Sequence, residues 1–157
     1  MKIKSSYIES HVIKFINNDI FFLMLKRAED EMFAGVWQPV TGTIDENEKA
    51  FETARREINE EIGVKIHSLF VIPFVNPFYL YRLDEINFVP VFVAQISERD
   101  EIKISNEHSD FKWMSPEEAK AVVAWEGQRK SIDIIVDYFT SKNNSLIFEK
   151  INFDYNK

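Results

Sequence analysis

The sequence predicts a fold of the α/β class, more closely α+β, in which a mixed β-sheet is sandwiched between helices. Runs rich in β-branched and aromatic residues stand on both sides of one strongly helical segment, and further helical signals follow near the end. With 157 residues and a hydrophobic share of 45%, the chain is large enough for one core and short for two. Because no repeat or Gly/Ser/Pro-rich linker divides it, we expect a single domain over residues 1–157.

The first predicted elements are a β-hairpin and a short extended piece. Extended runs cover 7–15 and 20–26, and the residues Asn17-Asn18-Asp19 between them favour a tight turn. A shorter extended run, 36–42, ends in glycine. We expect these segments to contribute strands to the sheet.

A helix is predicted next, over 45–61. Its apolar residues Ala50, Ala54 and Ile58 recur at every fourth position and so form a stripe along one side. Gly63 follows as a helix stop. The stripe is expected to pack on the sheet.

Two strands and two helices are predicted in the second half of the chain. β-branched and aromatic residues dominate two runs separated by a polar turn, and Ser115-Pro116 with two following glutamates is typical of a helix start. The predicted elements are strands over 64–81 and 86–96 and helices over 115–125 and 128–140. The remaining tail fits no single prediction.

Composition and charge narrow the class of protein. The net charge of -7 disfavours a non-specific grip on nucleic acid, so we expect no nucleic-acid partner. The chain has no cysteine, which excludes disulfides, thiolate zinc sites and a cysteine nucleophile, and fits a reducing compartment. The apolar runs are far shorter than the ~20 residues of a membrane span, and the first residues carry charges. We therefore expect a cytoplasmic protein without a membrane partner.

A spaced set of glycines, acids and one arginine spans residues 42–64. Its members, in order, are Gly42, Glu48, Arg56, Glu57, Ile58, Glu60, Glu61, Gly63 and Val64. In a helix Glu57, Glu60 and Glu61 stand at i, i+3 and i+4, so three carboxylates repel one another on one side. Such oxygen ligands suit Mg²⁺ or Mn²⁺, which would also allow an acidic protein to hold a polyphosphate. A solvated acidic surface is the alternative interpretation.

This spacing resembles the Nudix box, with every slot filled, and the segments around it resemble the Nudix α/β/α sandwich. The resemblance implies hydrolysis of a phosphoanhydride bond with Mg²⁺, or Mn²⁺ as a substitute. It implies metal ligation by Glu57, Glu60, Glu61 and the carbonyl of Gly42, with Arg56 orienting the carboxylates. Glu57 is the expected general base, although it fits a ligand role equally well, and Glu107 outside the box is the alternative base. We expect Gly42 to adopt a backbone conformation closed to other residues, and Gly63 fits a plain helix C-cap.

Residues outside the box resemble one branch of the family. Trp37 to Gly42 before it, and Glu107-His108 with Phe111-Lys112-Trp113 after it, are similar to dATP pyrophosphohydrolases, whose members also cleave dihydroneopterin triphosphate. By that resemblance Glu107 completes the metal shell, and Arg27 and Thr41 touch the nucleotide. The stretch 74–85 is short for this branch.

The candidate substrate contacts each have a structural alternative. They are Lys26, Arg27, Trp37, Thr41, Phe78 and His108. A basic pair at a strand end also serves as an exposed edge, and aromatic residues in a chain with 14 Phe also serve as core. His11 and His67 lie in strand patterns and are interpreted as structural.

The sequence thus predicts a Nudix pyrophosphohydrolase acting on a small nucleotide or pterin triphosphate. A dinucleoside polyphosphate or nucleotide-sugar hydrolase is the first alternative, because the same metal site would serve it. A nucleotide sensor without catalysis is the second, although the box carboxylates are complete. A homodimer is implied by family resemblance alone.

Overall fold

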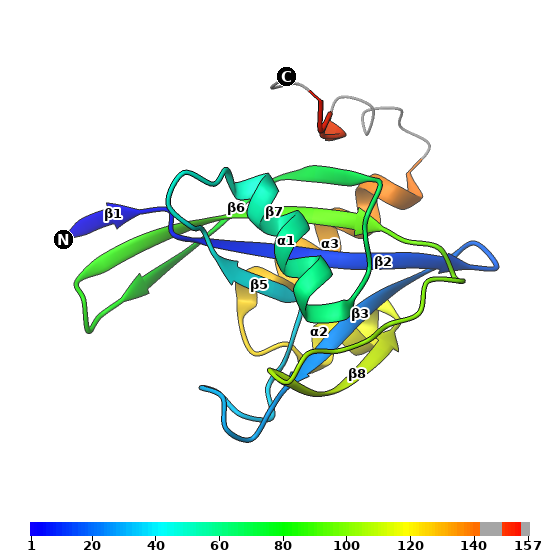
Figure 1. Ribbon diagram of the computed structural model, residues 1–157, viewed down its shortest axis with the longest axis horizontal. Helices are drawn as coiled ribbons and strands as arrows, with labels where there is room; N and C mark the ends of the chain where they lie inside the picture. Colours follow the sequence, from blue (N-terminus) through cyan, green and yellow to red (C-terminus); the bar gives the residue numbers. More distant parts are fainter. Residues whose placement is uncertain (142–148, 155–157) are drawn as a thin grey trace.

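In the computed structural model, described for residues 1–141 and 149–154, a mixed sheet lies between helices (Figure 1). The strands are β1 (Lys2–Lys4), β2 (Tyr7–Ile16), β3 (Asp19–Arg27), β4 (Trp37–Gln38), β5 (Val40–Thr43), β6 (Leu69–Leu80), β7 (Glu85–Gln95) and β8 (His108–Met114). The helices are α1 (Ala50–Ile62), α2 (Pro116–Val122) and α3 (Glu126–Thr140). The predicted sandwich of a mixed sheet and helices is therefore confirmed.

The sheet is mixed because its central strands have both parallel and antiparallel neighbours. β7 runs parallel to β2 and to the short β1, and antiparallel to β6. β2 pairs antiparallel with both β3 and β5, and β3 pairs antiparallel with β4 and β8. Strand β5, which contains Gly42, and strand β2 lie against α1.

Each face of the sheet has its own core. Ile8 and Val12 of β2 pack with Ile58 of α1 on one side, which we call the α1 side. Ile13 of β2 packs with Ile132 of α3 on the other, the α3 side. Successive strand residues point to opposite faces, so the parity of a strand residue decides which core it enters. Figure 1 shows α1 in front of the sheet and α2 and α3 behind it.

Several predicted boundaries are wrong, and among them α2 ends at Val122 rather than at residue 125 and α3 begins at Glu126 rather than at residue 128. The helix begins at Ala50 rather than at residue 45, because Asn47 has a left-handed backbone (φ 68°) and Lys49 is an extended N-cap residue. Strand β6 begins at Leu69 rather than at residue 64. His67, interpreted above as a strand residue, is exposed in the loop before it.

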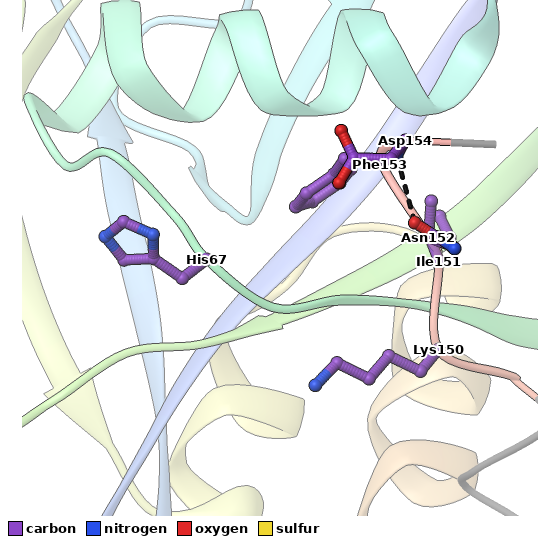
Figure 2. Close-up of a pocket in the computed structure, with 6 residues that line it drawn as sticks. All are labelled: His67, Lys150, Ile151, Asn152, Phe153 and Asp154. Carbon is purple, nitrogen blue, oxygen red and sulfur yellow. Dashed lines mark hydrogen bonds between the residues drawn. The ribbon is translucent and has the colours of Figure 1, made fainter. Parts of the chain in front are cut away.

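Strands β1 and β8 and the C-terminal segment were not predicted. The amide of Ile151 donates to the carbonyl of Leu69 (2.8 Å), and the guanidinium of Arg55 lies 3.9 Å from the ring centroid of Phe153. Figure 2 shows this segment beside His67, with which it lines an open pocket. The segment therefore ties the start of β6 to α1 without adding any box carboxylate to the pocket.

Within the described residues, no helix combines the length and apolar character that crossing a membrane requires.

Candidate active site

Gly42 and Glu57 bring β5 and α1 into direct contact. Gly42 stands opposite Ile8 in the ladder between β5 and β2, and a Cβ at Gly42 would overlap the side chain of Glu57. The backbone of Gly42 is not left-handed, so the predicted reason for this glycine is wrong. It is needed because the Glu57 carboxylate occupies the space of a side chain.

Arg56 forms hydrogen bonds with three glutamates of the box. Its Nε and Nη2 donate to the two carboxylate oxygens of Glu48 (both 3.0 Å), and its Nη1 donates to Glu57 (2.7 Å) and Glu60 (3.2 Å). Its Nη2 also donates to the carbonyl of Thr43 at the end of β5 (3.2 Å). The hydrogen bonds from Arg56 lower the pKa of Glu48 to about 2. Arg56 thus has the geometry of the orienting residue predicted above.

Glu61 is buried at the C-terminal end of α1. Its Oε2 lies 2.9 Å from Nε2 of His108, and both side chains are almost fully buried. The loop before β8 reaches this position because the amides of Lys103 and Ser105 donate to the carbonyls of Ile62 and Glu61 (2.9 Å each). These bonds also satisfy carbonyls that the end of a helix leaves without intrahelical partners.

Three side chains converge at this end of α1 with the spacing of metal ligands. One ligand atom each from Glu61, Glu107 and His108 lies within 4.8 Å of the others. Burial raises the pKa of Glu61 to about 7, and repulsion from Glu57 and Glu107 adds to the rise. Burial also raises the pKa of Glu57, with Glu60 and Glu107 as further repelling charges. A cation between these carboxylates would relieve the repulsion.

The donor set fits a hard divalent cation. Glu57, Glu61 and Glu107 offer carboxylate oxygens, and two of these acids are partly or fully withdrawn from water. Glu60 is 56% exposed and shares the Arg56 guanidinium with Glu57. Of the predicted ligands, the structure therefore brings Glu61 and Glu107 together, and it places Glu57 against Gly42.

His108 occupies a different place from the one expected of a substrate contact. The residue is 5% exposed, and its ring faces Glu61. A histidine that holds a carboxylate in this way orients a ligand rather than touching substrate. The substrate role of His108 remains a prediction, and in the structure its ring is buried against Glu61.

The family model described as NUDIX domain matches residues 10–133. The chain belongs to the Nudix family.

Several proteins are similar to this chain in sequence or in fold. Nucleoside triphosphatase NudI of Escherichia coli O139:H28 is 30% identical over 115 residues, which cover 68% of this chain and 82% of NudI. A Caenorhabditis elegans Ap4A hydrolase binary complex superposes with a TM-score of 0.73 at 19% identity, covering 86% of this chain and 96% of that one. The E. coli dihydroneopterin triphosphate pyrophosphohydrolase has a TM-score of 0.68 at 24% identity, with 83% and 95% covered.

These matches confirm two predictions. The resemblance of residues 42–64 to the Nudix box is confirmed by the family match, and the enzyme class, a Nudix pyrophosphohydrolase, is confirmed with it. The two solved structures show the shared Nudix fold.

Arg27 lies close to the acidic cluster, and Lys26 does not face it. Arg27 pairs with His108 across β3 and β8, and the amide of Ala28 donates to the carbonyl of Glu107 (2.9 Å). The Arg27 guanidinium donates to the carbonyl of Met32 and to Glu31. Lys26 pairs with Asp110 instead and stands two residues from Met24, which enters the core on the α3 side.

The other predicted contacts lie on the α3 side of the sheet. Thr41 is adjacent to Gly42, pairs with Glu9, and its hydroxyl accepts from Nε2 of Gln38 (3.4 Å). Phe78 is 40% exposed, and its ring centroid is 6.0 Å from that of Tyr7. Trp37 packs against the core on this side and is partly buried, so it has the structural place given above as its alternative.

A buried polar cluster on the α3 side was missed. His11 Nε2 lies 2.8 Å from Glu9, and Asn76 donates to the same carboxylate (3.1 Å). Burial alone would raise the pKa of Glu9, but hydrogen bonds from His11, Ser131 and Asn76 outweigh it and lower the pKa. Both amide atoms of the buried Asn87 lack a partner among the described residues. The sequence signal for this cluster was the pair of polar residues at alternate positions of β2, Glu9 and His11.

Proposed function

We propose that this Nudix hydrolase uses Mg²⁺, or Mn²⁺ in its place, to split a phosphoanhydride bond of a nucleoside triphosphate or related compound and release pyrophosphate. The observation that carries the proposal is the convergence of Glu61, Glu107 and His108 at the end of α1, with the repelling charge of Glu57, the neighbour of Gly42, added to it. The names of NudI and of the dihydroneopterin triphosphate pyrophosphohydrolase support a dATP-like nucleotide or dihydroneopterin triphosphate as substrate.

The roles of the residues follow from their contacts. When bound, the divalent ion would supply Lewis acidity toward phosphate oxygens and favour ionisation of water. We assign Glu57 to accept the proton of the attacking water, because burial raises its pKa and Arg56 holds it in place. A purely ligating Glu57 is the alternative. His108 fixes the rotamer of Glu61, and Arg27 is the nearest candidate for a phosphate contact.

The organic part of the substrate is proposed to lie on the α3 side of β5. Thr41, the residue before Gly42, points to that face. On the same face Phe78 presents a half-exposed ring and pairs with Asn87 in the β6–β7 ladder. An aromatic ring beside an unpaired amide supports stacking and hydrogen bonding to a heterocycle. Phe78→Ala should therefore raise KM for base-containing substrates and leave turnover of inorganic tripolyphosphate unchanged.

A product-resolved activity screen tests the function. The full chain would be assayed with Mg²⁺ and with Mn²⁺ against nucleoside triphosphates, dihydroneopterin triphosphate, nucleotide sugars and dinucleoside tetraphosphates. Pyrophosphate together with a monophosphate supports the proposal. No metal-dependent hydrolysis of any of these compounds would contradict it.

The similarity to an Ap4A hydrolase favours one second candidate, a dinucleoside polyphosphate hydrolase. Release of ATP from a dinucleoside tetraphosphate, faster than any pyrophosphate release from a triphosphate, would establish it. A sensor without catalysis fits less well, because it has no need of complete box acids held by Arg56 and His108. We further propose that residues 1–157 form one domain around this site.

A further inference from the structure

Two large aromatic side chains meet at the surface, one from the loop between β3 and β4 and one from the start of α3. The rings of Phe33 and Trp125 lie edge to face, with their centroids 5.6 Å apart and their planes at 82°. Phe33 is 59% exposed and Trp125 is 41% exposed. Exposed apolar residues that stand together are informative, whereas single ones are common. Much of both rings is therefore open to a ligand.

The loop that carries Phe33 is attached to the acidic cluster. The amide of Ala28, at the start of this loop, donates to the carbonyl of Glu107 (2.9 Å). The guanidinium of Arg27 donates to the carbonyl of Met32, the residue before Phe33. Figure 1 shows the loop, in light blue, projecting beyond the end of β3. Phe33 is thus held on a loop whose base adjoins one of the acids that converge at the end of α1.

The backbone of Phe33 is left-handed, with a φ of 59°. Bulky residues rarely adopt this conformation, because the Cβ comes too close to the backbone, and glycine or asparagine is favoured there. A phenylalanine in a strained and exposed position contributes neither to an easy turn nor to the core. The strain points to a role for the ring itself.

Trp125 lies near the place where the organic part of the substrate is proposed to sit. Val123 forms a parallel bridge with Trp37, so the chain runs on from Val123 in the same direction as it does from Trp37. From Trp37 that direction leads to Gln38, whose side chain donates to the Thr41 hydroxyl (3.4 Å). Trp125, two residues after Val123, therefore stands towards Thr41.

The start of α3 closes the other side of this area. A Cβ at Gly127 would overlap the Asn76 side chain, so the first turn of α3 rests directly on β6. Asn76 donates to Glu9 (3.1 Å), and Glu9 stands opposite Thr41 in the ladder between β2 and β5. Phe78 follows Asn76 by two residues and points to the same face. Because β6 and β4 lie on opposite sides of β2, Phe78 and the aromatic pair flank Thr41 and Glu9 from two sides.

We propose that Phe33 and Trp125 form an aromatic clamp that holds the heterocycle of the substrate. The clamp rests on the function proposed above, since it assigns the ring of a compound whose phosphates lie at the acidic cluster. Every nucleobase and every pterin has a π-face, so stacking favours planar rings as a class. A pair of rings that is already in place also lowers the cost of ordering on binding. The clamp therefore selects heterocyclic triphosphates over phosphate compounds without a ring, and does not choose between a purine and a pterin.

Two substitutions test the clamp with little disturbance of the fold. Phe33→Asn removes the ring and suits a left-handed backbone, and Trp125→Leu keeps an apolar side chain. On the triphosphate that is hydrolysed fastest, each should raise KM about tenfold, as loss of one stacking contact does, and leave kcat within about twofold. The inhibition constant of inorganic pyrophosphate, which has no ring, should stay unchanged. Tyr81→Leu is the matched control, because Tyr81 is 70% exposed in the turn between β6 and β7, and it should leave KM unchanged.

Tryptophan fluorescence gives a readout that does not depend on turnover. The α,β-methylene analogue of the triphosphate, added with Mg²⁺, should quench the wild-type chain, and pyrophosphate should not. Trp125→Leu should lose most of this quenching, with circular dichroism reporting the fold.

The outcomes separate the clamp from the proposed function. An unchanged KM in both variants, or a rise in the pyrophosphate inhibition constant equal to the rise in KM, would overturn the clamp in a chain that is still an active hydrolase. If no compound of the activity screen is hydrolysed, the proposed function fails, and fluorescence alone decides the clamp. Absence of quenching by the methylene analogues of both dATP and dihydroneopterin triphosphate would then overturn it.

Discussion

Glu48 and Glu61 belong to the same short motif, yet their pKa values move in opposite directions. Hydrogen bonds from Arg56 lower the pKa of Glu48 to about 2, whereas burial raises that of Glu61 to about 7. Glu48 has its counter-charge within the chain. Glu61 has a buried histidine and two neighbouring carboxylates, so its region is the one that gains most from a cation. The partner of a carboxylate, rather than its presence in the motif, decides its role.

The largest effect is expected from neutralising the acids in the Glu61 region. Glu57→Gln and Glu61→Gln should each lower kcat by roughly 10²–10⁴-fold, as removal of a general base or a metal ligand does. Glu61→Gln should keep its stability to urea, because it keeps volume and removes like-charge repulsion. Glu57→Gln should lose part of that stability together with its charge-assisted bond from Arg56. Glu101→Gln, on an exposed side chain, is the control. Wild-type kcat in both variants would refute the difference between the two regions.

Gly42→Ala should have the next largest effect. The new methyl group overlaps Glu57, and a displacement of about 1 Å in a catalytic group can cost roughly 100-fold in kcat/KM. Overpacking should also lower the free energy of unfolding by about 1–3 kcal/mol. In a Glu57→Ala background the same change should cost little stability, which a double-mutant cycle measures. Equal stability costs in both backgrounds would show that Gly42 does not position Glu57.

Metal binding should depend on pH through Glu61. A pKa raised to about 7 means that the folded protein keeps a proton that a metal ion must displace. Mg²⁺ affinity measured by calorimetry should rise about tenfold per pH unit below 7 and level off above it. Without metal, the stability contribution of Glu61 is present below pH 4.5, its ordinary value, and is lost as pH rises through about 7. Glu61→Gln should abolish this dependence, and an unchanged slope would reject the assignment.

Glu48→Gln should chiefly affect stability. Loss of its charge-assisted bonds to Arg56 should lower the free energy of unfolding by about 2 kcal/mol at pH 7, while activity falls less than in Glu61→Gln. The lowered pKa makes this contribution present above pH 4.5 and lost as pH falls toward about 2. Urea titrations at pH 7 and pH 3 measure it. A Glu48→Gln variant as inactive as Glu61→Gln would show that the two glutamates do not differ in their roles.

The smallest effects are expected at the basic pair. Arg27→Ala and Lys26→Ala should raise KM more than they lower kcat if these side chains hold phosphates equally in ground and transition states. Arg27 adjoins His108 and Glu107, so its change should be several-fold larger than that of Lys26. Steady-state kinetics on one triphosphate decides this. A larger effect at Lys26 would place the phosphates on the α3 side.

The sequence predicted those features that depend only on the spacing of residues along one helix or strand. Helical spacing predicted that Glu57 and Glu61 lie on one side of a helix, and runs of β-branched and aromatic residues predicted most strand centres. The start of α1 was missed because Asn47 adopts a left-handed backbone in the middle of a pattern that looks helical. The role of Gly42 was misjudged, because a steric conflict with Glu57 is visible only when β5 and α1 are packed together.

The box residues by themselves determined the family, the acidic character of the site and the need for a counter-charge, because these follow from residue types at fixed separations along one helix. The tertiary structure decided which acids converge. Glu61 meets His108, 47 positions away along the chain, only because the loop before β8 bonds the end of α1. It also decided that Val75 and Tyr79 of β6 stay exposed, which their apolar character does not predict.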